Sequence, residues 1–119
     1  MYELLSEGLY RKVWATDADA LHAWMLSLQR PPRVVLKAAI QRVADFGDAE
    51  LRRTGSLWKM LKKTDPTIFE IRRDQARLYC CMKGRDIVIL TWEQKKRKES
   101  DPRAIARAER LAMEILRGK

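Results

Sequence analysis

The fold is decided by residues 67–92, TIFEIRRDQARLYCCMKGRDIVILTW. This stretch holds three runs rich in β-branched, aromatic and other apolar residues, at 67–73, 76–82 and 86–92. Asp74-Gln75 separates the first two runs and Lys83-Gly84-Arg85 separates the last two, and short links of this kind are typical of hairpin turns. The last run is apolar on both faces, as expected of a central strand. The stretch therefore predicts three antiparallel strands.

Two helices are predicted before these strands, because apolar residues recur there at helical spacing. Thr16 opens the first helix, and Thr16 and Asp19 have the spacing of a capping box. Gln29-Arg30-Pro31-Pro32 ends it, since proline is excluded from helix interiors but suits the first turn of the next helix. Gly47 is a plausible C′ residue, just beyond the end of the second helix. The two apolar stripes are Leu21, Trp24, Met25 and Leu28, then Leu36, Ala39, Ile40 and Val43.

Both ends of the chain add one element each. A loose alternation at residues 8–14 predicts a first strand, and Asp101-Pro102 predicts the start of a final helix. The paired helices form a hairpin that must lay its apolar face on another layer. We therefore expect an α+β fold in one domain over residues 1–119. It consists of a helical hairpin packed on a small, twisted, mostly antiparallel sheet, with a C-terminal helix.

The charge of the chain is concentrated in its second part. The formal net charge is +9, and residues 1–48 are neutral, with six basic and six acidic side chains. Residues 49–119 hold the remaining nineteen basic and ten acidic side chains, which accounts for the whole excess. Such asymmetry favours a polyanionic partner, most often nucleic acid, over a merely soluble basic surface.

Composition also indicates the compartment. No stretch approaches 18 uncharged apolar residues, and the acidic start of the chain does not look like a signal peptide. Cys80 and Cys81 are adjacent, and neighbouring side chains on a strand point to opposite faces, so we expect two reduced thiols. These observations predict a cytoplasmic protein.

The predicted strands bring a set of polar side chains to one face of the sheet. Strand alternation places Glu70 with Arg72, and Arg77 with Tyr79, on the face opposite the apolar residues. The basic run Lys95-Lys96-Arg97-Lys98 follows the next strand and could line the same surface. Arginine suits phosphate oxygens, and Tyr79 could stack on an unstacked base. We expect this face to bind RNA, with Arg77 as the stronger of the two arginine candidates.

Any catalysis at this face must proceed without a metal or a histidine. The single histidine, His22, lies within an apolar helical pattern, and the sequence has no CxxC, Walker A, GxSxG or GxGxxG motif. We therefore expect no metal and no cofactor. RNA cleavage is compatible with this, because the 2′-hydroxyl is an internal nucleophile and the protein need only orient the strand, neutralise the phosphate and move two protons.

Residues 57–115 resemble the RelE/ParE toxin superfamily, and most of all its HigB-like, phage-associated branch. The resemblance rests on short motifs in a fixed order: Leu57, Phe69-Glu70-Ile71-Arg72, Arg77-Leu78-Tyr79, Gly84, Ile87-Val88-Ile89-Leu90, Lys95-Lys96 and the helix Ile105–Leu116. Two departures stand out. Thr91-Trp92 replaces the more usual His-Phe pair, and no tyrosine or histidine follows Trp92.

The resemblance implies a ribosome-dependent mRNA endonuclease (an mRNA interferase) of a type II toxin-antitoxin system. Its partners would be mRNA, the ribosome and an antitoxin, often a helix-turn-helix protein. By the same resemblance, Arg72 and Arg77 would stabilise the scissile phosphate, while Lys95 and Lys96 would bind RNA or supply a proton. Two alternatives remain. One is a non-enzymatic ParE-like toxin that inhibits DNA gyrase. The other is an inactive, phage-derived interaction protein, which the missing acid/base residues favour.

Overall fold

The computed structural model describes residues 2–29, 32–96 and 98–118. Six strands and four helices lie within this part of the chain. In chain order they are β1 (Glu3–Glu7), β2 (Lys12–Ala15), α1 (Ala18–Ser27), α2 (Pro32–Asp45), α3 (Asp48–Arg53), β3 (Trp58–Met60), β4 (Phe69–Arg73), β5 (Ala76–Lys83), β6 (Asp86–Gln94) and α4 (Pro102–Arg117). The predicted α+β class is confirmed.

The strands form one sheet in the order β1-β2-β6-β5-β4-β3. Every neighbouring pair is antiparallel except β2 and β6, which run parallel. The predicted meander of β4, β5 and β6 is confirmed, and β6 lies inside the sheet as its apolar faces indicate. Both hairpin turns contain a residue with positive φ, Asp74 at 51° and Gly84 at 64°. Aspartate and glycine tolerate this region, which explains where the meander turns.

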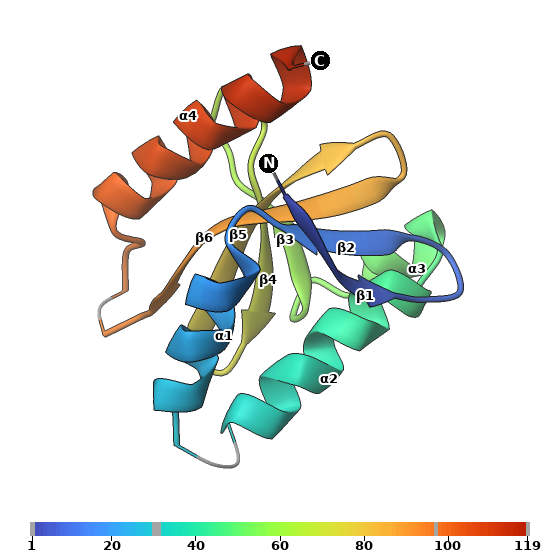
Figure 1. Cartoon of the computed structure of the whole chain (residues 1–119), viewed down its shortest axis with the longest axis vertical. Helices are drawn as coiled ribbons and strands as arrows, with labels where there is room; N and C mark the ends of the chain where they lie inside the picture. The colour runs from blue at the N-terminus through green and yellow to red at the C-terminus, as the bar shows by residue number, and fades with distance from the viewer. Residues whose placement is uncertain (1, 30–31, 97, 119) are drawn as a thin grey trace.

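Helices cover both faces of the sheet (Figure 1). On one face, α1 and α2 pack against a core that includes Val13, Ile71, Leu78 and Ile89. On the other face, α4 packs through Ala108, Ala112 and Ile115 against a second cluster that includes Val88 and Leu90. The predicted start of the last helix is also confirmed. Asp101 accepts a hydrogen bond from the Arg103 amide, and Pro102 begins the helix.

The two adjacent cysteines illustrate this two-sided core. Cys80 belongs to the cluster beneath α1 and α2, while Cys81 belongs to the cluster beneath α4. Both are free thiols, as predicted. Burial raises the pKa of Cys80 well above its ordinary value and that of Cys81 to about 11. Neither side chain is a nucleophile at neutral pH.

Two local predictions were wrong at the N-terminal end, and one short helix was missed. Residues 8–14 do not form one strand, because the chain turns between Gly8 and Arg11 and makes the hairpin of β1 and β2. The cap of α1 is Asp17 rather than Thr16, whose hydroxyl donates instead to the carbonyls of Ile89 and Leu90 in β6. Gly47 lies two residues after the last residue of α2, at the predicted C′ position, but its backbone is extended, and it also precedes α3, which the sequence did not predict.

Arg11 ties the N-terminal hairpin to the helices. Its side chain is buried and donates to the carbonyls of Val43, Phe46 and Arg85, and it pairs with Asp48 at 3.1 Å. The Arg11 guanidinium beside Asp48 holds the pKa of that carboxyl below its ordinary value. This buried arginine therefore completes hydrogen bonding where the chain leaves α2.

No helix in the described ranges is long and apolar enough to cross a membrane.

Candidate functional site

The polar residues of the predicted strand face lie on the side of the sheet that α4 covers. Strand register arranges them in two rows across the sheet. The first row is Lys59, Glu70, Tyr79 and Thr91, from β3 to β6. The second row is Arg72, Arg77 and Glu93, from β4 to β6. Directly paired residues share a face, so the predicted grouping of Glu70, Arg72, Arg77 and Tyr79 is confirmed.

Glu70 lies between the two arginines. Its carboxylate is 3.6 Å from Arg72 Nε and 3.8 Å from Arg77 Nε, and its side chain is only 5% exposed. These distances are too long for hydrogen bonds. Among the described residues, Glu70 Oε1 and both arginine Nε atoms are buried without a hydrogen-bond partner. Glu70, Arg72 and Arg77 together therefore carry a net positive charge, and the two arginine Nε atoms are buried donors without an acceptor.

The two arginines differ in how freely they can meet a ligand. Arg77 is 8% exposed, and its Nη1 donates to the carbonyls of Asp74 and Ala76, at 2.7 and 2.9 Å. The Arg72 side chain is 31% exposed and makes one weaker bond to the Gly55 carbonyl at 3.3 Å. The expectation that Arg77 stands on an open face was wrong, because it folds back on its own turn. Arg72 is better placed to contact a phosphate.

Tyr79 is fully buried, so the predicted stacking of its ring on a base has no surface on which to occur. The ring packs in the cluster beneath α4, and its hydroxyl donates to Glu93 Oε2 at 2.5 Å. Burial, together with the Glu93 carboxylate, raises the pKa of Tyr79 far above its ordinary value. Tyr79 therefore remains a protonated donor to Glu93 at physiological pH.

The basic run after β6 starts a short loop that leads to α4. Lys95 is half-buried, and its amine donates to the Lys98 carbonyl at 2.6 Å while its amide donates to Gln75. Lys96 and Lys98 are exposed. The prediction for Arg97 falls outside the described residues. The structure thus presents Lys96 and Lys98 to solvent and uses the Lys95 amine to close the loop.

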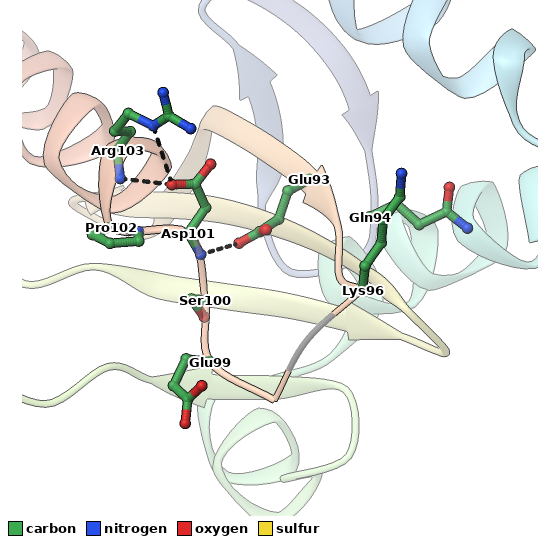
Figure 2. Close-up of a pocket in the computed structure, with 8 residues that line it drawn as sticks. All are labelled: Glu93, Gln94, Lys96, Glu99, Ser100, Asp101, Pro102 and Arg103. Carbon is green, nitrogen blue, oxygen red and sulfur yellow. Dashed lines mark hydrogen bonds and ion pairs between the residues drawn. The ribbon is translucent and has the colours of Figure 1, made fainter.

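A pocket of about 520 Å³ opens beneath this loop (Figure 2). Glu93 points into it toward the start of α4, where its Oε2 accepts a hydrogen bond from the Asp101 amide at 3.0 Å. Lys96 and Arg103 supply cations at the same pocket. The lining is Glu93, Gln94, Lys96, Glu99, Ser100, Asp101, Pro102 and Arg103.

Sequence reasoning missed Glu93, and the reason is a β-bulge. Thr91 pairs with Tyr79 and Ile89 pairs with Cys80, which leaves Leu90 as an extra residue in β6. Strict alternation from Ile87 would have placed Glu93 on the face of α1 and α2. The bulge moves Thr91 and Glu93 to the α4 face, because an inserted residue shifts the alternation by one.

Across the described residues, no group of three or more histidine, cysteine, aspartate or glutamate side chains is arranged to hold a metal ion. The groups that this site supplies are guanidinium, ammonium, carboxylate and phenol. Together they could bind an oxyanion and move a proton.

The fold and the site define a small α+β protein with a pocket of mixed charge between the end of β6 and the start of α4. Residues 23–112, from α1 into α4, match the family of phage derived protein Gp49-like (DUF891). The match covers most of the chain, which therefore belongs to this phage-derived family. Neither curated proteins nor solved structures match the chain.

Proposed function

We propose that this protein is a ribosome-dependent mRNA endonuclease of the RelE/HigB-like type, the toxin of a type II toxin-antitoxin pair. The observation that carries the proposal is that Arg72 and Arg77 share one cross-strand row with Glu93, which lines the pocket under the basic loop after β6. Membership in the phage-derived Gp49-like family agrees with this assignment.

The arginines would act on the scissile phosphate in different ways. Arg72 is the accessible guanidinium, and it would offer a planar fork to the phosphate oxygens. Arg77 would act at a distance, by holding Glu70 beside Arg72 and by adding positive potential below the surface. Lys96 and Lys98 would bind the RNA backbone or ribosomal RNA, with the salt dependence that counterion release produces.

A second candidate function is an inactive, phage-derived interaction protein that kept the fold. The burial of Arg77 and Tyr79 favours it, because neither side chain is free to touch RNA directly. In that case the basic surface would serve a protein or RNA partner without cleavage.

Expression of the chain alone tests the proposal. We expect wild-type protein to stop growth and translation, and co-expression of the neighbouring small gene, the expected antitoxin, to restore both. Arg72→Ala should abolish the effect, because loss of one oxyanion-stabilising group typically lowers a rate by roughly 10²–10³-fold. Arg73→Ala is the matched control, since Arg73 is exposed and follows Arg72 on the opposite face of β4.

Three outcomes separate the candidates. Growth arrest with intact mRNA and inhibited gyrase supercoiling would identify a ParE-like toxin. Normal growth at confirmed soluble expression would identify the inactive interaction protein. Equal toxicity of the Arg72→Ala and Arg73→Ala variants would remove Arg72 from the mechanism.

A further inference from the structure

Glu93 combines three properties that no other described carboxylate at this site has together. It lines the pocket, it is held in place by two donors, and it stands in the same cross-strand row as Arg72 and Arg77. Both of its hydrogen bonds, from the Tyr79 hydroxyl and the Asp101 amide, reach Oε2. Within the described residues, Oε1 makes no hydrogen bond.

The other carboxylates at this end of the sheet are already engaged or loosely placed. Glu70 is buried between the two arginines. Asp101 caps α4 and pairs with Arg103 at 3.7 Å. Glu99 is exposed on the loop, and no hydrogen bond or ion pair among the described residues fixes its side chain. Glu93 is the carboxylate that is both fixed and open to a ligand (Figure 2).

We propose that Glu93 is the general base of RNA cleavage at this pocket, an inference that rests on the proposed endonuclease function. Glu93 Oε1 accepts the proton of a ribose 2′-hydroxyl, and the 2′-oxygen bonds to the adjacent phosphorus. The bond from phosphorus to O5′ breaks, and O5′ takes a proton from water. The products are a 2′,3′-cyclic phosphate and a 5′-hydroxyl end.

The positions of Arg72 and Glu93 in one cross-strand row are compatible with a phosphate-binding arginine and a general base. Neighbouring strands lie about 4.8 Å apart, so Arg72 on β4 and Glu93 on β6 are two strand spacings apart, with Arg77 between them. A phosphate above Arg77 would lie one strand spacing from each. Three carboxylates and two cations line the pocket, and Arg103 pairs with Asp101, so Lys96 is the lining cation that has no ion pair among the described residues and could contact the phosphate. Tyr79 stays protonated in its buried position and continues to orient Oε2. The site thereby contains the proton acceptor that the sequence, without a late tyrosine or histidine, did not reveal.

The test compares Glu93→Gln with Glu93→Asp in single-turnover cleavage of mRNA on translating ribosomes. Gln keeps the length and the acceptor oxygen but cannot take the proton, whereas Asp keeps the base on a shorter stem. For a general base, we expect Glu93→Gln to lose roughly 10²–10⁴-fold in rate, with ribosome binding and melting temperature close to wild type. Glu93→Asp should be faster than Glu93→Gln. The matched control is Glu114→Gln, an exposed carboxylate of α4 that does not line this pocket, and this variant should cleave like wild type.

A purely structural role predicts the opposite order, because Gln preserves both hydrogen bonds and Asp does not. Glu93→Gln cleaving at the wild-type rate, or faster than Glu93→Asp, overturns the assignment. Added formate should restore part of the cleavage to Glu93→Ala, and its failure to do so would also count against a base. If wild-type protein itself leaves the mRNA intact, both the general base and the proposed endonuclease function fall. If the wild-type protein cleaves the mRNA but Glu93→Gln is not slower than Glu93→Asp, only the general-base assignment falls and the proposed endonuclease function is retained.

Discussion

Removing the Arg77 side chain should destabilise the fold far more than removing that of Arg72. Arg77→Ala takes away one of the two guanidinium groups that neutralise Glu70, whose side chain is 5% exposed, and it leaves two carbonyls without their donor. Breaking a buried ion pair by removing one partner costs about 3–5 kcal/mol. Arg72 is 31% exposed and makes one long hydrogen bond, so water screens its pair with Glu70 and its loss should cost about 1 kcal/mol.

Thermal and urea denaturation of the two purified variants measure this difference. For a chain of this size, 1 kcal/mol corresponds to roughly 3–5 °C, so Arg77→Ala should lower the melting temperature by about 10–20 °C. Adding Glu70→Gln to Arg77→Ala should recover part of the loss, because the unpaired buried charge disappears. Equal melting temperatures for Arg72→Ala and Arg77→Ala, or no recovery in the double variant, would refute the buried ion-pair account.

Three further predictions concern the surface, the thiols and pH. Reversal of Lys96 and Lys98 to Glu should flatten the dependence of ribosome binding on salt, by about 0.7 in log–log slope for each phosphate of single-stranded RNA that the variant no longer neutralises. The control is the double variant Lys37→Glu/Arg52→Glu, at exposed positions of α2 and α3, which should keep the wild-type slope. If the Lys96/Lys98 variant also keeps the wild-type slope, the loop does not bind the RNA. Cys80 and Cys81 should react with a disulfide reagent at pH 8 only after denaturation, because both are buried with raised pKa values; rapid reaction of the native protein would contradict their burial. Finally, Asp48 has a lowered pKa in the fold, so its contribution to stability is present above its unfolded pKa of about 3.9 and is lost as the pH falls through the folded value. Asp48→Asn should therefore reduce the acid sensitivity of unfolding below about pH 4, and an unaltered pH profile would argue against the pair with Arg11.

The elements that sequence predicted well are those with long, regular patterns. The meander from β4 to β6 has apolar runs bounded by turn residues, and α4 has both a cap and a complete apolar stripe. The elements that it missed or misplaced, β1, β3 and α3, are short. β3 has three residues and α3 has six, too few for either pattern to repeat.

The sequence predicted only part of the candidate site, because strand alternation places side chains correctly only where the strand pairing is regular. Alternation correctly placed Arg72 and Arg77 on one face, because β4 and β5 pair without a bulge between those residues and Tyr79. It could not show that α4 would cover the same face and bury Tyr79, since helix packing depends on the whole fold. It also could not place Glu93, because one extra residue at Leu90 reverses the pattern.

The most direct test of the central proposal is the fate of an mRNA in a reconstituted translation reaction with purified protein. Primer extension on that mRNA, with and without ribosomes, maps any new ends. We expect discrete cuts that require ribosomes and no metal beyond what translation uses. The cuts should disappear with Arg72→Ala but not with Arg73→Ala. Full-length mRNA in the presence of translating ribosomes and folded wild-type protein would contradict it.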